Sequence, residues 1–318
     1  TTTTTTTTKP PLVSWSLDET TKVGTITLES PATYNALTVE MGHEFSQAMR
    51  DIQHELSFGK KKDIHAMVLT SAAGTNAFSA GGNFEWLRSL RDDTPIHTNA
   101  DAMLSFYQSF LCLRDLIPVP VIAALQGPAV GAGAGLALAC DLRVAASSSS
   151  SGGGGASSSS SGANKNKNNT SSKQRMLLGF TFSRLGIHAG MGVSHLLPQC
   201  LGNRAGLVNE LLLTGKGLSA QEAYDLGLVN RLVVDGDGDG DAVKEEAYKL
   251  AREVASQHPV SVRTMVQTLR GQQDVGLQAA LLREAYAQAT CYARNDWGAG
   301  LDAVEERRDP VFDSYHDK

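Results

Sequence analysis

IAALQGPAVGAGAGLALACD, residues 122–141, is the part of the chain from which the architecture is easiest to infer. Its first four residues are all apolar, which predicts a strand buried on both faces. The glycines that follow predict a tight turn and then an apolar helix that begins at the turn. The first N–H groups of a helix have no partner within it and lie at the positive end of its dipole, so they stabilise a ligand oxygen that gains negative charge.

A second turn of this kind lies about fifty residues upstream. Residues 76–87 read NAFSAGGNFEWL and follow AMVLTS, residues 66–71, which has the composition of a strand. Small side chains in both turns let a ligand approach the backbone closely. Two such turns can converge on one oxygen, so we expect them to form one site.

This pair of turns resembles the crotonase superfamily, the enoyl-CoA hydratase/isomerase family. Three further segments carry the same resemblance: LESPATYNAL at residues 28–37, LTGKGLSAQEAYDLGLVN at residues 213–230, and EERRDPVF at residues 305–312. The similarity covers roughly residues 12–313. It implies an α/β fold of the ClpP/crotonase-like type, a spiral of ββα units followed by a C-terminal helical region.

The resemblance also implies an activity and its site. Family members hold an acyl-CoA thioester carbonyl between two backbone N–H donors, the oxyanion hole, and act as lyases or isomerases in fatty acid metabolism. Counted from the glycine turns, the donors fall on Ala80 and Ala132. The acyl-CoA is the substrate, and no further cofactor and no metal are expected. Residues expected to contact the substrate are Ala36, Ser79, Gly81, Gly82, Gly131, Gly133, Gly135, Phe182 and Gly190.

The acid and base groups of the family are missing from their usual positions. Related hydratases carry carboxylates at the positions of Gly135 and Phe182, and related isomerases carry one at Gly190. His188 is the alternative proton carrier, because an imidazole titrates near neutral pH; its other interpretation is a hydrogen-bonded loop residue. We expect Glu85, His195 and Asp141 to have structural roles, with Glu85 in reserve as a second proton carrier.

Several functions therefore remain open. The first is an enoyl-CoA hydratase/isomerase type of enzyme whose exact reaction is not fixed. The second is a crotonase-fold thioesterase or decarboxylase, which needs the oxyanion hole without paired glutamates. The third is a catalytically weak acyl-CoA-binding protein. A dinucleotide site is disfavoured, because the glycines at 131, 133 and 135 do not have the GxGxxG spacing.

Composition limits the possible partners and compartments. The chain has 318 residues, a net charge of −5 and 41% hydrophobic residues, without an apolar run long enough to span a membrane. No basic cluster with interleaved aromatic residues is present, which argues against nucleic acid as a partner. Four dispersed cysteines without a CxxC pair predict a reducing intracellular compartment. Mitochondrial, peroxisomal and cytoplasmic locations are not distinguished.

The chain is expected to divide into three parts. Residues 1–11 form a disordered leader, residues 12–203 the spiral core with a low-complexity insertion at 147–173, and residues 204–318 the helical region. By resemblance, this last region makes the contacts of a homotrimer or a dimer of trimers. Asp235 to Glu246 matches the spacing of a calcium loop, but a strand precedes it where a helix is usual, which favours a solvated turn.

Overall fold

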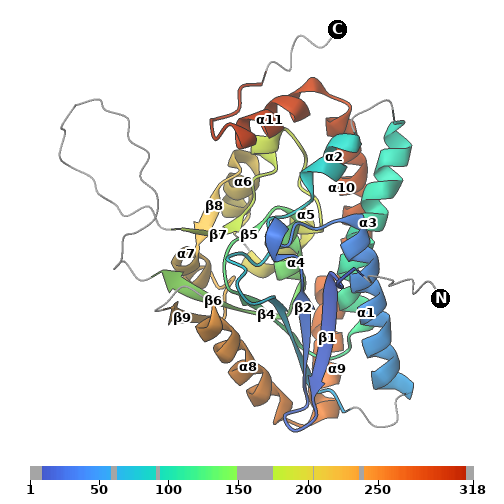
Figure 1. The fold of residues 1–318 in the computed structure, drawn as a ribbon, viewed down its shortest axis with the longest axis vertical. Helices are drawn as coiled ribbons and strands as arrows, with labels where there is room; N and C mark the ends of the chain where they lie inside the picture. The colour runs from blue at the N-terminus through green and yellow to red at the C-terminus, as the bar shows by residue number, and fades with distance from the viewer. Residues whose placement is uncertain are drawn as a thin grey trace, which may run out of the picture.

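The structure, a computed structural model, describes residues 9–58, 63–90, 94–148, 175–202, 204–235 and 240–312 (Figure 1). The expected leader up to Thr8, the insertion from residue 149 onward and the middle of the Asp–Gly repeat lie outside the described residues. The rest has the α/β fold that we expected, and its strands form two sheets.

The larger sheet has six strands. Its first two strands form an antiparallel hairpin, and all later neighbours pair in parallel. Parallel neighbours need crossover connections, which the intervening helices supply. In spatial order the strands are β1 (Val13–Asp18), β2 (Val23–Leu28), β3 (Ala66–Ser71), β4 (Val121–Leu125), β6 (Leu142–Ser148) and β9 (Arg231–Asp235).

Helices cover both faces of this sheet. Successive side chains of its central strands point to opposite faces and are buried on both, so each face needs a covering layer. Val68 and Ile122 pack against Val243 and Ala247 of α8 (Asp241–Ala255) on one face. The opposite face belongs to the main core, to which α1 (Val39–Phe58) and α3 (Ile96–Leu116) contribute. In Figure 1, α8 lies at the lower left, and α1 and α3 lie on the right. The all-apolar strand predicted from the sequence, now seen as β4, is therefore a buried strand.

The smaller sheet lies beside the glycine-led helix α4 (Ala132–Ala139). Its central strand pairs in parallel with one neighbour and antiparallel with the other. One strand of each sheet lies beyond residue 203, where we expected the spiral core to end. Each of these two strands pairs with a strand from before that residue. The strands of this sheet are β5 (Ala129–Val130), β7 (Met176–Gly179) and β8 (Gly217–Ser219). Between β7 and β8 the chain forms helices α5 (Val193–Leu201) and α6 (Ala205–Thr214), and after β8 it forms α7 (Ala220–Asp225).

The last three helices are α9 (Pro259–Gln273), α10 (Leu277–Tyr292) and α11 (Asn295–Glu305). Helix α10 packs along α3, and α11 packs on the short helical turn Ser183–Leu185. A short helix, α2 (Phe84–Ser89), follows the first glycine turn. Among the described residues, no helix has both the length and the apolar character that crossing a membrane requires.

Candidate active site

The first glycine turn is held by the segment that contains Asn35. The Leu37 N–H donates to the Gly81 carbonyl over 2.7 Å, and the Asn83 N–H donates to the Leu37 carbonyl over 2.9 Å. Asn35 is fully buried, and its side-chain amide donates to the Phe78 carbonyl. Its φ of 52° lies in the left-handed region, which asparagine tolerates better than most residues. The NAL motif recognised in the sequence thus supports the turn from residue 78 to residue 83.

The second glycine turn lies directly beside the first. Ser79 and Ala129 form a parallel bridge, in which the Val130 N–H donates to the Ser79 carbonyl over 3.0 Å. At Gly81, where φ is +97°, a Cβ would lie 2.6 Å from the Val130 carbonyl oxygen and 3.6 Å from the Ala132 nitrogen. Both the backbone conformation and the lack of space therefore require glycine at this position.

The hydrogen bonds correct one of the two expected donors. The Ala80 N–H is not free, because it donates to the Tyr34 carbonyl over 2.9 Å. Within the described part of the chain, the N–H groups of Gly82 and Ala132 have no acceptor. Gly82 lies three residues after Ser79, and Ala132 lies three residues after its bridge partner Ala129. The free pair is therefore Gly82 and Ala132, with Ala132 as the first residue of α4.

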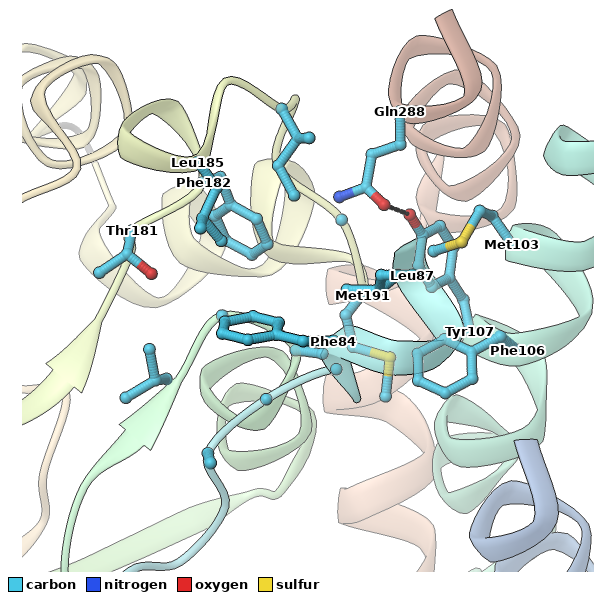
Figure 2. A pocket seen from close by; sticks show the side chains of 18 of the residues that line it. Phe84, Leu87, Met103, Phe106, Tyr107, Thr181, Phe182, Leu185, Met191 and Gln288 are labelled. Carbon is cyan, nitrogen blue, oxygen red and sulfur yellow. Dashed lines mark hydrogen bonds between the residues drawn. The ribbon is translucent and has the colours of Figure 1, made fainter. Parts of the chain in front are cut away.

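An apolar pocket lies next to this pair (Figure 2). Figure 2 shows Phe182 and Leu185 on one side of the pocket and Tyr107 and Gln288 on the other. No aspartate, glutamate or histidine belongs to its lining among the described residues. The residues that line it are Ala80, Gly81, Gly82, Phe84, Leu87, Met103, Phe106, Tyr107, Val130, Gly131, Ala132, Thr181, Phe182, Leu185, Ile187, Gly190, Met191, Gln288 and Tyr292.

The polar side of the pocket is a connected network of neutral groups. The hydroxyls of Tyr107 and Tyr292 both donate to Gln288 Oε1, over 2.7 and 2.9 Å. Gln288 Nε2 donates to the His188 carbonyl over 2.7 Å. Burial raises the pKa of both phenols, and for Tyr107 the nearby Tyr292 and Glu284 raise it as well. Both tyrosines therefore stay protonated near neutral pH.

The three positions that carry carboxylates in related enzymes have different surroundings. A Cβ at Gly135 would lie 2.5 Å from the Met191 carbonyl oxygen, so this position has no room for a side chain. A Cβ at Gly190 would lie 2.5 Å from the Tyr107 hydroxyl and 2.6 Å from Gln288 Nε2. Phe182 is buried, and its ring lines the pocket.

His188 is not where we expected it. Its Nδ1 lies 2.6 Å from the Ala189 carbonyl oxygen, and the side chain is not part of the pocket lining. The loop turns Gly190 and Met191 toward the pocket, while His188 contributes its carbonyl to the network through Gln288. The structure thus supports the alternative interpretation of His188 as a hydrogen-bonded loop residue.

The remaining sequence-predicted residues divide between pocket and support. Gly81, Gly82, Gly131, Phe182 and Gly190 line the pocket, and so does Ala80 despite its paired N–H. Four are not part of the lining: Ala36, Ser79, Gly133 and Gly135. A Cβ at Gly133 would lie 2.6 Å from the Ser79 carbonyl oxygen, so the close contact between Gly133 and Ser79 holds the two turns together.

The three side chains for which we expected structural roles have structural surroundings. Glu85 is exposed in the first turn of α2, where an acidic group is favoured by the helix dipole. His195 Nε2 lies 2.7 Å from the Gln273 carbonyl oxygen. Asp141 accepts from the Val121 N–H and from Arg270. None of the three lines the pocket within the described residues.

Sequence reasoning missed the polar network, although a signal for it exists. Glu284 and Gln288 are polar residues spaced four apart on the face of α10 that carries Leu281, Ala285 and Tyr292. Polar side chains within an apolar stripe are expected to have buried partners. The partners, Tyr107 on α3 and the loop at 188–194, are distant in sequence, so only the fold identifies them.

Fold and site together define the class: a crotonase-fold protein with two free N–H groups beside an apolar pocket. A sequence profile of the enoyl-CoA hydratase/isomerase family matches residues 18–158 and 170–315, so the chain belongs to that family. It is 31% identical over 290 residues to a Thermus thermophilus protein that is named provisionally as an enoyl-CoA hydratase, covering 91% of this chain and 97% of that protein.

Solved structures agree with this assignment. A crystal structure of an enoyl-CoA hydratase from Polaromonas sp. JS666 superposes with a TM-score of 0.63 at 25% identity, over 94% of this chain and 98% of the other. An enoyl-CoA hydratase/isomerase from Pseudoalteromonas atlantica T6c reaches a TM-score of 0.68 at 24% identity, over 95% and 99% of the two chains, and so shares the fold.

Proposed function

We propose that the chain is an acyl-CoA enzyme of the enoyl-CoA hydratase/isomerase type that stabilises a thioester enolate between the N–H groups of Gly82 and Ala132. The observation that carries this proposal is that Gly82 and Ala132, which lie at equivalent positions after the bridge partners Ser79 and Ala129, both line the apolar pocket, and that their N–H groups have no acceptor among the described residues. One donor of this kind contributes about 3–4 kcal/mol to a transition state that develops negative charge on oxygen.

The residues that line the pocket favour some reactions of this type over others. Hydration by two glutamates needs carboxylates that activate water and protonate the α-carbon, and the described pocket lining has none. A positioned acid or base supplies about 10²–10⁴-fold in rate. We therefore place enolate stabilisation at the centre of the function and expect slow hydration. Thioester hydrolysis or decarboxylation uses the same two donors and is the alternative within enzymes.

A decisive experiment deletes one donor while keeping the helix. Ala132 is the first residue of α4, a position where proline is tolerated, so Ala132→Pro removes the N–H with little disturbance. Ala132→Ser, which keeps the N–H, is the matched control. Exchange of the α-protons of butyryl-CoA in D₂O, followed by NMR, is expected to fall by about 10²-fold in the proline variant only. Equal exchange in folded Ala132→Pro and wild type would overturn the proposal.

The absence of acid and base groups from the described lining favours one other candidate. A protein that binds acyl-CoA without turning it over would keep the pocket and need no proton carrier. Binding of butyryl-CoA by the wild type, with neither α-proton exchange nor turnover of a panel of acyl-CoAs, would select this candidate.

Assembly and compartment are further parts of the proposal. We propose a homotrimer, or a dimer of trimers, formed through the C-terminal helices, where Met265 and Leu269 of α9 are more than half exposed. We also propose a reducing compartment, since the four cysteines within the described residues are free. Burial raises the pKa of the Cys112 and Cys140 thiols to about 12, which keeps both protonated. A human relative is named a mitochondrial enoyl-CoA hydratase domain-containing protein; it is 35% identical over 140 residues, 43% of this chain and 46% of that protein.

A further inference from the structure

The pocket is open at one end and closed at the other. Val130, Gly131 and Ala132, at the open end, are partly exposed. Figure 2 shows Thr181, which is also partly exposed, on the side of the pocket opposite Tyr107. The side chains at the closed end are at most 4% exposed: Met103, Phe106, Tyr107, Gln288 and Tyr292.

This difference between the two ends orients an acyl-CoA in the pocket. Coenzyme A is a large and highly charged group, which an apolar, buried wall cannot accommodate. A thioester held by the N–H groups of Gly82 and Ala132 therefore directs its coenzyme A toward the open end. Its acyl chain then points toward the closed end.

The wall at the closed end is held by hydrogen bonds between two helices. Tyr107 of α3 and Tyr292 of α10 both donate to Gln288 Oε1, and Gln288 Nε2 donates to the His188 carbonyl. The Tyr292 hydroxyl also lies 3.8 Å from the Met103 sulfur. Turning either ring aside would leave buried polar groups without partners, which is costly. The wall is therefore expected to keep its position when a longer ligand enters.

The space in front of this wall is small. The pocket has a volume of about 60 Å³. One water needs about 10–15 Å³ of such space, so the pocket takes about four to six waters, or a similar number of non-hydrogen atoms. A butyryl group, with four carbons and the carbonyl oxygen, matches this size, whereas an octanoyl group exceeds it.

We propose that the wall formed by Met103, Tyr107 and Tyr292 limits the length of the acyl chain, so that the protein accepts short, uncharged acyl groups of about four carbons. This inference rests on the proposed acyl-CoA function and goes beyond it by naming the substrate class. Among the described residues no charged side chain lines the pocket, so an acyl group that ends in a carboxylate would bury that charge without a partner.

Calorimetric binding of a series of acyl-CoAs tests the limit. Each buried methylene strengthens binding about fourfold, so wild type is expected to bind butyryl-CoA about tenfold more tightly than acetyl-CoA. Octanoyl-CoA and dodecanoyl-CoA are expected to bind about tenfold more weakly than butyryl-CoA, because their additional carbons meet the wall. Succinyl-CoA, which has four acyl carbons and a second carboxylate, is expected to bind weakly as well.

A variant with a shortened wall makes the test specific. Met103→Ala deepens the closed end and keeps both phenols and Gln288, so the affinity for octanoyl-CoA relative to butyryl-CoA is expected to rise about tenfold. Leu113→Ala is the matched control, because Leu113 is fully buried on the same helix and does not line the pocket. Both variants lose stability through a cavity, but only Met103→Ala should change the preference for chain length.

Two results would overturn the limit alone. One is dodecanoyl-CoA binding to wild type as tightly as butyryl-CoA, and the other is an unchanged preference for chain length in folded Met103→Ala. The first measurement uses wild type only, so it decides the question even if the variant does not fold. Failure of wild type to bind any of the thioesters would instead overturn the proposed function together with this inference.

Discussion

At the residue scale, two glycines of the pocket wall are required by space already filled. Gly135 touches the Met191 backbone, and Gly190 faces Tyr107 and Gln288. At both positions, where related enzymes carry carboxylates, the neighbouring residues have also changed the available space. The Met191 backbone leaves no room for a side chain at Gly135, and the neutral polar groups of Tyr107 and Gln288 fill the space beside Gly190. A single substitution is therefore not expected to restore a two-glutamate hydratase.

This leads to a prediction for Gly135→Glu. The new Cβ would lie 2.5 Å from the Met191 carbonyl oxygen, and backbone cannot move aside as a flexible side chain can. We expect a loss of about 3 kcal/mol or more in the free energy of unfolding, and no gain in crotonyl-CoA hydration. Urea denaturation and loss of the conjugated thioester absorbance measure the two quantities. A stable variant that hydrates faster than wild type would contradict the geometry of this position.

A second residue-scale prediction concerns Glu284, which is fully buried and accepts from the N–H groups of Gly192 and Ser194. Burial raises the pKa of this carboxyl from 4.5 to about 7, against the opposing effect of those hydrogen bonds. The folded state therefore holds a proton that the unfolded state has lost. The resulting stabilisation is complete below the unfolded pKa and is lost as pH rises through the folded pKa.

The prediction is a difference between wild type and Glu284→Gln. Between about pH 4.5 and pH 7, the free energy of unfolding of wild type should fall relative to the variant by about 3 kcal/mol, at about 1.4 kcal/mol per pKa unit. Urea denaturation at a series of pH values measures it. Parallel pH profiles for the two proteins would show that Glu284 does not titrate in this range.

At the element scale, one buried arginine joins three elements. Arg270 of α9 donates to the carbonyls of Arg114, Ile117 and Val119 at the end of α3 and before β4. It also forms a two-point ion pair with Asp141, at 2.8 and 2.6 Å. Carbonyls at the end of a helix have no partner within it, so Arg270 satisfies groups that would otherwise be buried unpaired.

We therefore predict that Arg270→Met lowers the free energy of unfolding by about 3 kcal/mol or more, because Asp141 is left as an uncompensated charge. Arg270→Lys should recover only part of this loss, since an ammonium group cannot form the two-point pair. Arg283→Met, at an exposed position of α10, is the control and should stay within about 0.5 kcal/mol of wild type. Urea midpoints that are equal for Arg270→Met and the control would exclude this role.

The sequence predicted elements better than it predicted contacts between them. Apolar continuity identified the buried strand now seen as β4, and the glycines after it identified the start of the apolar helix α4. Spacing alone cannot show which N–H is already paired, which is why Ala80 was chosen and Gly82 is the free donor. For the same reason the sequence could not show that Tyr107 and Gln288, on different helices, are hydrogen-bonded, because this depends on the packing of α3 against α10.

At the scale of the whole molecule, the family and its fold follow from the two turns, the NAL motif and their order, all readable in the sequence. The position of His188 does not, because the direction of a loop side chain depends on the packing of α10 against residues 188–194. The exposed apolar surface cannot be predicted from the sequence either. Composition gives the number of apolar residues, but only the fold shows that Met265 and Leu269 share an exposed face of α9.

That exposed face carries the last prediction, which tests the proposed assembly. Met265 and Leu269 are 54% and 58% exposed and four residues apart, so they lie on the same side of the helix. Large side chains left exposed in this way mark a surface that another subunit can cover.

In sedimentation velocity, wild type is expected to have about three times the 33.7 kDa mass of one chain, or six times for a dimer of trimers. The double variant Met265→Glu, Leu269→Glu should shift the distribution toward single chains, because burying two carboxylates in an apolar contact is costly. Val311→Glu, at a position 75% exposed beyond the last helix, should leave the mass unchanged. A wild-type protein that sediments as a single chain would exclude the trimer, and an unchanged mass in the folded double variant would place the subunit contact elsewhere on the molecule.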